Sequence, residues 1–453
     1  MRDLKGKHIV IAGAARSGVA AAILLKMKGA VPFVSDSGEI KSSSAERLIN
    51  SGIEFEERQH SDRAFDGEFL VVSPGVPSSS PIVQNYLTNN RSVFSEIELA
   101  SWFNQSPTVA VTGSNGKTTV ANWLAHTWQL SGREYILAGN IGTAFTEQVN
   151  ESKPGKTALL EISSFQLDHI DSFRPDVSIL LNITEDHLDR YDHNFTQYAN
   201  SKLKITKNQT SSDWFIYNFD DPIISAHAIE LSNQIDSPKI LAFSSSKEVP
   251  NGAFIRNGNL ILKLNNEEEQ LMQIGEIGLS GTHNLQNSMA TALAARASEI
   301  KNEFIRESLK SFEGVPHRLE FVREYKGIKY INDSKATNVN AVWYALDSFN
   351  TPMVLILGGR DKGNDYSLLS HQIREKVHTI VAIGEAREEI KKQLKDLVPN
   401  FIEANSMKDA VKQSRNVAKR GEIVLMSPAC SSFDMFDNYE HRGNEFKQAV
   451  INL

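Results

Sequence analysis

The 453-residue sequence contains a single cysteine, Cys430. One cysteine excludes an internal disulfide and is typical of a reducing compartment. The sequence also has no apolar run that approaches the roughly 18 residues needed to span a bilayer. Its start, "MRDLKGKHIVIAG", has neither the apolar core nor the cleavage site of a signal peptide. We therefore expect a cytoplasmic protein that does not insert into a membrane.

An excess of positive charge is missing as well. The formal net charge is −7, so no overall positive field draws the protein to nucleic acid or to anionic lipid. An anionic ligand must therefore meet local groups of Lys and Arg. Because 40% of the residues are hydrophobic, the chain is able to bury several cores, and its length predicts about three domains.

Three segments alternate short apolar strands with longer amphipathic helices, which predicts α/β domains with mainly parallel sheets. We place them at residues 1–95, 96–313 and 314–453. The strand-like runs are "KHIVIAG", "VPFVSDS" and "EFLVVSP", then "TVAVTG", "TALLEIS" and "VSILLNIT", and finally "MVLILGG", "HTIVAIG" and "EIVLMSP". The middle segment also contains "AFIRNGNLILKL", which predicts a hairpin with Asn257-Gly258 as its tight turn.

The stretch "TGSNGKTT", residues 112–119, resembles a phosphate-binding loop but has Val111 where the usual pattern has its first glycine. An apolar strand precedes it and a helical pattern follows. Backbone N–H groups at such a helix start favour an anion. Lys117 offers an ammonium group to phosphates, and Thr118 offers a hydroxyl to Mg²⁺. We therefore predict a variant P-loop in an ATPase-type α/β domain.

A second glycine turn, Gly13, Ala15 and Gly18, follows the first strand, and Asp36 ends the next one. The pattern indicates a Rossmann-like domain. Ala15 stands where a glycine lets the backbone approach a pyrophosphate, which disfavours NAD. Two alternatives stay open: a uridine or other single nucleotide in this crevice, with Asp36 toward the uracil or ribose, and a close strand-to-helix crossing without a ligand.

Polar side chains follow two further strands of the middle segment. Glu161 ends "TALLE", where open α/β sheets bind ligands, and a carboxylate there suits Mg²⁺. "NITEDHLDRY" supplies His187 after the next strand. Lys202, by contrast, looks like a solvated helix lysine. For Cys430 we expect a buried small residue rather than a nucleophile, and Trp123 and Trp128 are predicted core residues.

Longer blocks occur in the order found in one family. They are "TGSNGKTT", "GNIG", "LEISSFQL", "TEDHLDRY", "SKLKI", "GTHNLQN", "GVPHRLE", "NDSKATN", "LGGRDKG" and "SPACSSFDMFDNYEHRGNEF". On these blocks the sequence resembles the Mur ligases of peptidoglycan synthesis, across all three segments. The last block is similar to that of the D-glutamate-adding members. The resemblance implies a Rossmann-like first domain for a UDP-sugar, a central P-loop-type ATPase domain and a Rossmann-like C-terminal domain for the amino acid.

The resemblance also implies a reaction and its site residues. ATP phosphorylates the carboxylate of UDP-N-acetylmuramoyl-L-alanine, and D-glutamate attacks the acyl phosphate to give an amide, ADP and phosphate. Catalysis is implied for Lys117, Glu161, His187 and Lys202. ATP binding is implied for Gly113, Ser114, Asn115, Gly116, Lys117, Thr118, Thr119, Asn284, Asn287, Arg318 and Asp333. The UDP-sugar is assigned to Ser17, Asp36, Ser73, Asn140 and His187, and D-glutamate to Lys335, Thr337, Lys362, Ser432 and Tyr439.

Two Mg²⁺ ions are implied on Thr118, Glu161, His187 and Lys202. A cationic Lys202 about 4 Å from Mg²⁺ would be repelled by roughly 8 kcal/mol at an effective dielectric near 20. The resemblance resolves this conflict, because the matching lysine is carbamylated by CO₂ and becomes an anionic ligand. We expect a monomer whose partners are these small substrates.

Other functions remain as alternatives. The nearest are a sister ligase that adds L-alanine and a folylpolyglutamate-type synthetase. A non-catalytic sugar-nucleotide sensor would not require the set Lys117, Glu161, His187 and Lys202. An NAD-linked reductase is disfavoured by Ala15.

Overall fold

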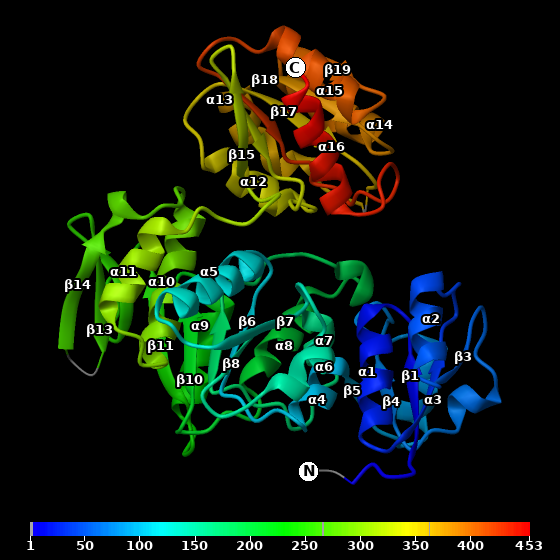
Figure 1. Ribbon diagram of the computed structural model, residues 1–453. Coiled ribbons are helices and arrows are strands. Elements are labelled where there is room, and N and C mark those ends of the chain that lie inside the picture. Colours follow the sequence, from blue (N-terminus) through cyan, green and yellow to red (C-terminus); the bar gives the residue numbers. More distant parts are fainter. Residues whose placement is uncertain (1–2, 265–266, 362) are drawn as a thin grey trace. The chain divides into compact units, whose positions relative to one another are not determined.

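The computed structural model describes residues 3–264, 267–361 and 363–453. These residues form three α/β domains, each built on one sheet (Figure 1). The chain divides into two compact units: residues up to Gly278 with Leu285–Phe312, and Leu279–Asn284 with Glu313–Leu453. In the described part of the chain, no helix combines the length and the apolar character that crossing a membrane requires.

The first domain is a parallel sheet with the order β3-β2-β1-β4-β5. Its elements are β1 (His8–Ala12), α1 (Arg16–Met27), β2 (Val31–Ser35), α2 (Ser42–Asn50), β3 (Glu54–Glu56), β4 (Leu70–Val72), α3 (Pro81–Thr88), β5 (Val93–Ser95) and α4 (Glu96–Ser101). Successive residues of β1 face opposite sides: Ile9 packs in the core with α1, and Val10 in the core with α3. Burial on both faces confirms the predicted doubly covered parallel sheet.

The central domain has the strand order β14-β13-β12-β11-β10-β9-β6-β8-β7. Its strands are β6 (Thr108–Thr112), β7 (Tyr135–Gly139), β8 (Thr157–Glu161), β9 (Val177–Leu180), β10 (Trp214–Asn218), β11 (Lys239–Ser244), β12 (Gly252–Arg256), β13 (Asn259–Leu264) and β14 (Glu267–Gln273). Its helices are α5 (Lys117–Leu130), α6 (Phe145–Gln148), α7 (Ser164–Asp168), α8 (Phe195–Leu203), α9 (Pro222–Ser232), α10 (Thr282–Ala297) and α11 (Asn302–Ser311). Strands β6 to β11 are parallel to their neighbours, and β12 is parallel to β11, so the carboxyl ends of β6, β7, β8 and β9 share one edge.

The predicted hairpin is confirmed. β12 and β13 are antiparallel, and Asn257 and Gly258 both have positive φ, at 52° and 74°, as a type I′ turn requires. Sequence analysis did not find β14, which pairs with β13 at the edge of the sheet. Its first four residues, "EEEQ", are exposed. Charge on an exposed edge strand protects against edge-to-edge pairing and removes the apolar pattern that predicts a strand.

The last domain has the strand order β15-β16-β20-β17-β18-β19, with only β15 antiparallel among the described strands. Its elements are β15 (Glu320–Tyr325), β16 (Ile328–Asn332), α12 (Val339–Asp347), β17 (Met353–Gly358), α13 (Ser370–Lys376), β18 (Val377–Ile383), α14 (Arg387–Leu394), β19 (Asn400–Glu403), α15 (Met407–Val417), β20 (Ile423–Met426) and α16 (Tyr439–Ile451). Asp333, Lys335 and Thr337 follow β16, and Ser432 and Tyr439 follow β20, whereas Arg318 precedes β15.

Candidate active site

The stretch 112–119 forms a strand, a glycine loop and a helix start. β6 is fully buried, and α5 begins at Lys117. Gly113 and Gly116 have φ of 152° and 87°. A Cβ on Gly116 would lie 2.5 Å from the Asn287 Oδ1 atom. Both glycines are therefore required by geometry, whereas Val111, the departure from the usual pattern, lies inside β6.

Two anchors hold the loop against the chain segment after β9. The Ser114 hydroxyl donates to the Thr184 carbonyl at 2.8 Å, and the Asn115 N–H donates to the Asn182 Oδ1 atom at 2.8 Å. That segment leads directly to His187, so the loop and the histidine are tied together through local hydrogen bonds.

Two lysines converge on one carbonyl of this loop. The Lys117 ammonium donates to Gly113 O and Ser114 O, both at 2.8 Å, and the Lys202 Nζ atom donates to Gly113 O at 2.9 Å. Lys202 lies on α8 and is only 2% exposed. The expectation of a solvated helix lysine is therefore wrong. Lysines are solvated on most helix surfaces, but this one points inward under the loop.

The environment of Lys202 favours its neutral amine. Burial first, and then the charge of Lys117, hold the pKa of Lys202 well below the ordinary value of a lysine. The aromatic ring of Tyr198 covers the group at 4.7 Å from its centroid. Desolvation disfavours the ammonium form, so this side chain is suited to nucleophilic chemistry on its nitrogen.

Glu161 connects the phosphate loop to the end of β7. Its side chain is buried and accepts from the Thr118 hydroxyl at 2.7 Å and from the Asn140 amide at 2.9 Å. A carboxylate beside a hydroxyl at the start of a phosphate-binding helix is a donor set that suits Mg²⁺. Among residues 3–264, 267–361 and 363–453, no three His, Cys, Asp or Glu side chains group to hold a metal by themselves. An Mg²⁺ ion bound at Thr118 and Glu161 would take its further ligands from phosphate oxygens or water.

His187 lies beside the lysines. Its φ is 52°, immediately before the short 3₁₀ helix η3 (Leu188–Arg190), and its ring packs edge-on against Phe165 at 5.2 Å. A cavity of about 380 Å³ gathers most of the predicted catalytic residues; it is lined by Pro74, Gly75, Lys117, Asn140, Ser163, Ser164, Phe165, Asp186, His187, Asp189, Arg190, Tyr198 and Lys202. The structure thus brings together three of the four residues predicted for catalysis, and Glu161 joins them through its hydrogen bond to Asn140.

A neighbouring cavity of about 310 Å³ lies at the first glycine turn. It is lined by Ala15, Arg16, Ser17, Ser73, Pro74, Gly75, Gly139, Asn140 and Gln166. Pro74, Gly75 and Asn140 line both cavities. An elongated ligand is therefore able to extend from the glycine turn of the first domain to the phosphate loop.

Asp36 and Ser73 also support the glycine turn itself. The Asp36 carboxylate accepts from the N–H groups of Ala14 and Gly38, at 2.7 and 2.8 Å. The Ser73 hydroxyl donates to Gly13 O at 3.0 Å. A Cβ on Gly18 would lie 1.8 Å from that same carbonyl, so the close strand-to-helix crossing is real. Asp36 does not belong to the described lining of the cavity, unlike Ser17 and Ser73.

In the last domain, Asp333 follows β16 and is buried. It accepts from the Ser427 hydroxyl at 2.7 Å and from the Leu319 N–H at 3.2 Å. Burial raises the pKa of Asp333 to about 6, although the charge of Arg318 acts in the opposite direction. The Lys335 ammonium lies 5.2 Å from the ring centroid of Tyr439. Ser432, which follows Cys430 closely in the sequence, is buried.

The remaining predicted residues are placed as follows. Asn284 and Asn287 lie on α10, and both are buried. Asn284 donates to Ser280 O at 2.8 Å. Thr119 is buried on α5, and Thr337 is half-buried before α12. Lys362 falls outside the described residues.

Sequence analysis missed several residues of the 380 Å³ cavity. Arg190 and Tyr198 stand in or beside quoted motifs but received no role. Phe165 and the segment Pro74–Gly75 were also overlooked. Proximity to "DHLDRY" and to "SPG" was the available signal, but one sequence does not reveal which side chains of a loop point inward.

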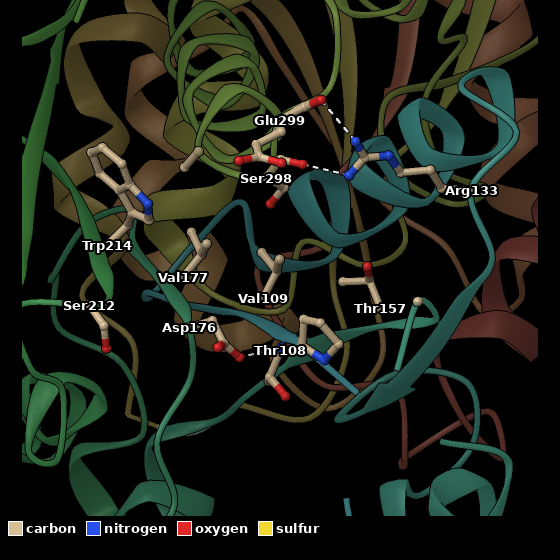
Figure 2. Close-up of a pocket in the computed structure, with 13 residues that line it drawn as sticks. Thr108, Val109, Arg133, Thr157, Asp176, Val177, Ser212, Trp214, Ser298 and Glu299 are labelled. Carbon is tan, nitrogen blue, oxygen red and sulfur yellow. Dashed lines mark hydrogen bonds between the residues drawn. The ribbon is translucent and has the colours of Figure 1, made fainter. Parts of the chain in front are cut away.

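The largest described cavity lies elsewhere. It measures about 490 Å³ and opens at the amino ends of β6, β8, β9 and β10 (Figure 2). Figure 2 shows Arg133 at its margin, where the guanidinium donates to Ser298 O and Glu299 O at 2.5 and 2.8 Å. None of the predicted site residues lines it. Ligands of open α/β sheets bind at the carboxyl ends of strands, so we place the active site at the smaller cavities.

Comparison with known proteins gives a family match for each of the three domains. Residues 9–82 match the MurD N-terminal domain, residues 111–295 the Mur ligase middle domain, and residues 317–430 the Mur ligase glutamate ligase domain. A UDP-N-acetylmuramoylalanine–D-glutamate ligase of Salinibacter ruber is 46% identical over 456 residues, covering 100% of this chain and 99% of the relative. The enzyme of the same description from Chloroherpeton thalassium is 46% identical over 466 residues, with 100% and 99% covered.

Solved structures show the same fold at lower identity. The UDP-N-acetylmuramate-alanine ligase MurC of Thermotoga maritima has a TM-score of 0.60 at 17% identity, with 98% of this chain and 99% of that chain covered. The MurF ligase of the same organism, solved with ADP, has a TM-score of 0.61 at 16% identity and covers 100% of both chains. On its three matched domains and its full-length relatives, the chain belongs to the Mur ligase family, in the MurD branch.

Proposed function

We propose that this chain joins D-glutamate to UDP-N-acetylmuramoyl-L-alanine with hydrolysis of ATP to ADP and phosphate, as its MurD relatives are named for doing. The observation that carries the proposal is full-length identity of 46% to D-glutamate ligases. The phosphate loop of this chain supports it, because hydrogen bonds hold the loop side chains in place. The reaction belongs to peptidoglycan synthesis.

ATP is assigned to the loop Gly113–Thr119. The N–H groups at the start of α5 point along the helix dipole, which favours phosphate, and Lys117 adds a positive charge. Asn284, Asn287, Arg318 and Asp333 are proposed to complete the nucleotide site. Phosphoryl transfer needs mainly positioning and charge neutralisation, which these groups provide without a side-chain nucleophile.

The UDP-sugar is assigned to the two joined cavities. Its uridine end would occupy the cavity of Ser17 and Ser73, with Asp36 supporting the turn, and its L-alanyl carboxylate would reach Asn140 and His187. The carboxylate oxygen then forms a bond to the γ-phosphorus of ATP while the bond from that phosphorus to the β–γ bridging oxygen breaks. Lys117, whose ammonium donates to Gly113 O at 2.8 Å, would stabilise the charge that collects on the transferring phosphoryl group.

D-glutamate is assigned to the last domain, at Lys335, Thr337, Lys362, Ser432 and Tyr439. Its neutral amine attacks the acyl carbon, a carbon–nitrogen bond forms, the carbon–oxygen bond to phosphate breaks, and the nitrogen releases a proton to solvent. Alignment of amine and acyl phosphate supplies on the order of 7 to 11 kcal/mol. We keep the domain boundaries 1–95, 96–313 and 314–453, a monomeric state and a cytoplasmic location as parts of the proposal.

Mg²⁺ fits the residues present. Thr118 and Glu161 would hold one ion, and His187 with a carbamate on Lys202 would hold a second; bound Mg²⁺ would neutralise phosphate charge. The buried position of Lys202 and its lowered pKa support the carbamate. The neutral amine adds to CO₂, a nitrogen–carbon bond forms as one carbon–oxygen π bond breaks, and a proton leaves to solvent.

A coupled assay tests the function. ADP release is measured with ATP, UDP-N-acetylmuramoyl-L-alanine and each amino acid in turn. We expect release that depends on D-glutamate and that matches amide formed, one to one. Release stimulated by L-alanine with UDP-N-acetylmuramate, and not by D-glutamate, would instead identify an alanine-adding ligase.

A further inference from the structure

Arg190 makes an unusual set of hydrogen bonds between the central and first domains. Its guanidinium donates to Gly75 O at 3.2 Å, to Pro74 O at 3.2 Å and to Val76 O at 3.0 Å. These carbonyls are consecutive in the segment that follows Ser73. One side chain thereby holds three successive peptide groups of another domain.

The guanidinium also packs over the ring of Phe165 on α7. Its carbon lies 4.3 Å from the ring centroid of Phe165. The same ring contacts His187 edge-on at 5.2 Å and stacks on Tyr191 at 5.9 Å. Arg190 and the Phe165 ring therefore connect the segment Pro74–Val76 to the histidine assigned to the acceptor.

The position of that segment matters because Pro74 and Gly75 line both cavities. A ligand that occupies both cavities must fit the distance between them, and that distance depends on where the segment lies. A planar guanidinium with several fixed donors is able to define such a position. A lysine, with one flexible ammonium group, is not equivalent.

We propose that Arg190 is a positioning residue that holds the segment Pro74–Val76 in register with His187, so that one sugar nucleotide contacts both cavities at once. This inference rests on the proposed function. It assigns a specific effect: Arg190 contributes to binding of the two-ended substrate and not to binding of either end alone.

The test compares two ligands by titration calorimetry on the full chain. In the proposed assignment, UDP occupies only the 310 Å³ cavity at the first glycine turn, whereas UDP-N-acetylmuramoyl-L-alanine extends into both cavities. For Arg190→Ala we expect affinity for the long substrate to fall about tenfold, because loss of register lowers the effective concentration of its second end. Affinity for UDP should change less than about twofold. The affinity of Arg190→Lys for the long substrate should lie between that of Arg190→Ala and that of the wild type.

A matched control is Arg133→Ala. Arg133 also donates two hydrogen bonds to backbone carbonyls, but at the opposite edge of the central sheet, so neither affinity should change. In kinetics, Arg190→Ala should raise KM for the UDP-sugar and leave KM for ATP unchanged.

Three outcomes would overturn the inference. Equal weakening of UDP and of the long substrate would show local damage to the segment after Ser73. Unchanged affinity for both would remove Arg190 from substrate binding. A wild-type chain that binds UDP but not UDP-N-acetylmuramoyl-L-alanine would refute the proposed function itself, and the inference with it.

Discussion

The carboxyl edges of the central and last sheets hold their candidate residues in different ways. At the central edge, functional side chains bond to one another, as Thr118 and Asn140 do to Glu161. At the edge of the last sheet, the buried Arg442 organises the loops through other groups. Its guanidinium donates to Ser334 Oγ at 2.9 Å, to Ser334 O at 2.7 Å and to Cys430 O at 3.0 Å.

This difference indicates two kinds of sensitivity. The central edge contains two lysines on one carbonyl and a buried carboxylate, so its function depends on charge and protonation. The last edge depends on the shape of two loops, one before Lys335 and one before Ser432, that a single arginine connects. Substitutions that change charge should therefore affect the central edge most, and substitutions that change loop geometry should affect the last edge most.

The largest effect is expected for Lys202→Met. Loss of the side chain that we propose carries the carbamate should reduce turnover on the order of 10³-fold, as for removal of a preorganised electrostatic group. A matched control is Lys204→Met, because Lys204 is the next lysine along and pairs with Asp168 near the surface. Turnover is measured by ADP release. Full activity of the Lys202 variant would exclude it from the mechanism.

The same substitution should stabilise the protein in CO₂-free buffer. The folded-state pKa of Lys202 is lowered, so below the unfolded pKa the unfolded chain binds a proton that the folded chain resists. The stability of the wild type therefore falls as pH decreases from about 10. Methionine has no such proton, so the Tm advantage of the variant should grow over that range. A constant difference in Tm would contradict the lowered pKa.

Asp333 is an exception at the last edge, because its carboxyl group is buried and its protonation affects stability. Its folded-state pKa is raised to about 6, so its contribution to stability is present below the unfolded pKa, near 4, and is lost as pH rises through 6. The Asp333→Asn variant has no carboxyl group that ionises at this position, so it does not lose this stability as pH rises. From pH 4 to pH 7 the stability of the variant relative to the wild type should rise by up to about 3 kcal/mol.

Urea unfolding of both proteins across this pH range provides the measurement. Any pH-independent cost of the altered hydrogen bonds to Ser427 and Leu319 cancels, because only the change with pH is compared. A difference that stays constant between pH 4 and pH 7 would mean that Asp333 ionises normally in the folded chain.

The sequence predicted the central edge better than the last edge. Lys117 was found from a glycine loop between an apolar strand and a helix, and Glu161 and His187 were found from the ends of apolar strands. The burial of Lys202 was not predictable, because a lysine on a short amphipathic helix has no local signal of direction. β14 and β15 were missed since these partly exposed strands lack a continuous apolar pattern. The buried strands β10, β11 and β16 were not predicted either.

The two arginines that hold backbone segments in place, Arg190 and Arg442, were missed for a different reason; we call each of them a clamp. Arg190 and Arg442 bond mainly to backbone carbonyls, and every residue type carries a carbonyl. No partner residue in the sequence therefore marks such an arginine. Only the folded chain shows which peptide groups lie within reach.

Arg442→Lys tests the last edge through loop geometry. The charge stays, but one ammonium cannot replace hydrogen bonds to both loops. We expect KM for D-glutamate to rise about tenfold, corresponding to about 1.4 kcal/mol, with a smaller change in KM for UDP-N-acetylmuramoyl-L-alanine. Arg323→Lys is the control, because Arg323 donates to Val450 O and Ile451 O away from these loops.

Ser334→Ala provides a milder change at the same point, since it removes the hydroxyl that accepts from Arg442 and donates to Tyr439 O. Its KM for D-glutamate should rise less than that of Arg442→Lys. An unchanged KM in both variants would disconnect this clamp from D-glutamate.

The smallest effect is expected for Cys430→Ala. The thiol is buried against Tyr366 at 3.0 Å, and burial raises the pKa of Cys430 to about 12. The nucleophilic thiolate is therefore scarce at neutral pH, and turnover by ADP release should stay within about twofold of the wild type. Arg442 bonds to the Cys430 carbonyl, which alanine retains. Full activity in Cys430→Ala beside a raised KM in Arg442→Lys would show that this position contributes its backbone; a tenfold loss in Cys430→Ala would require a role for the thiol.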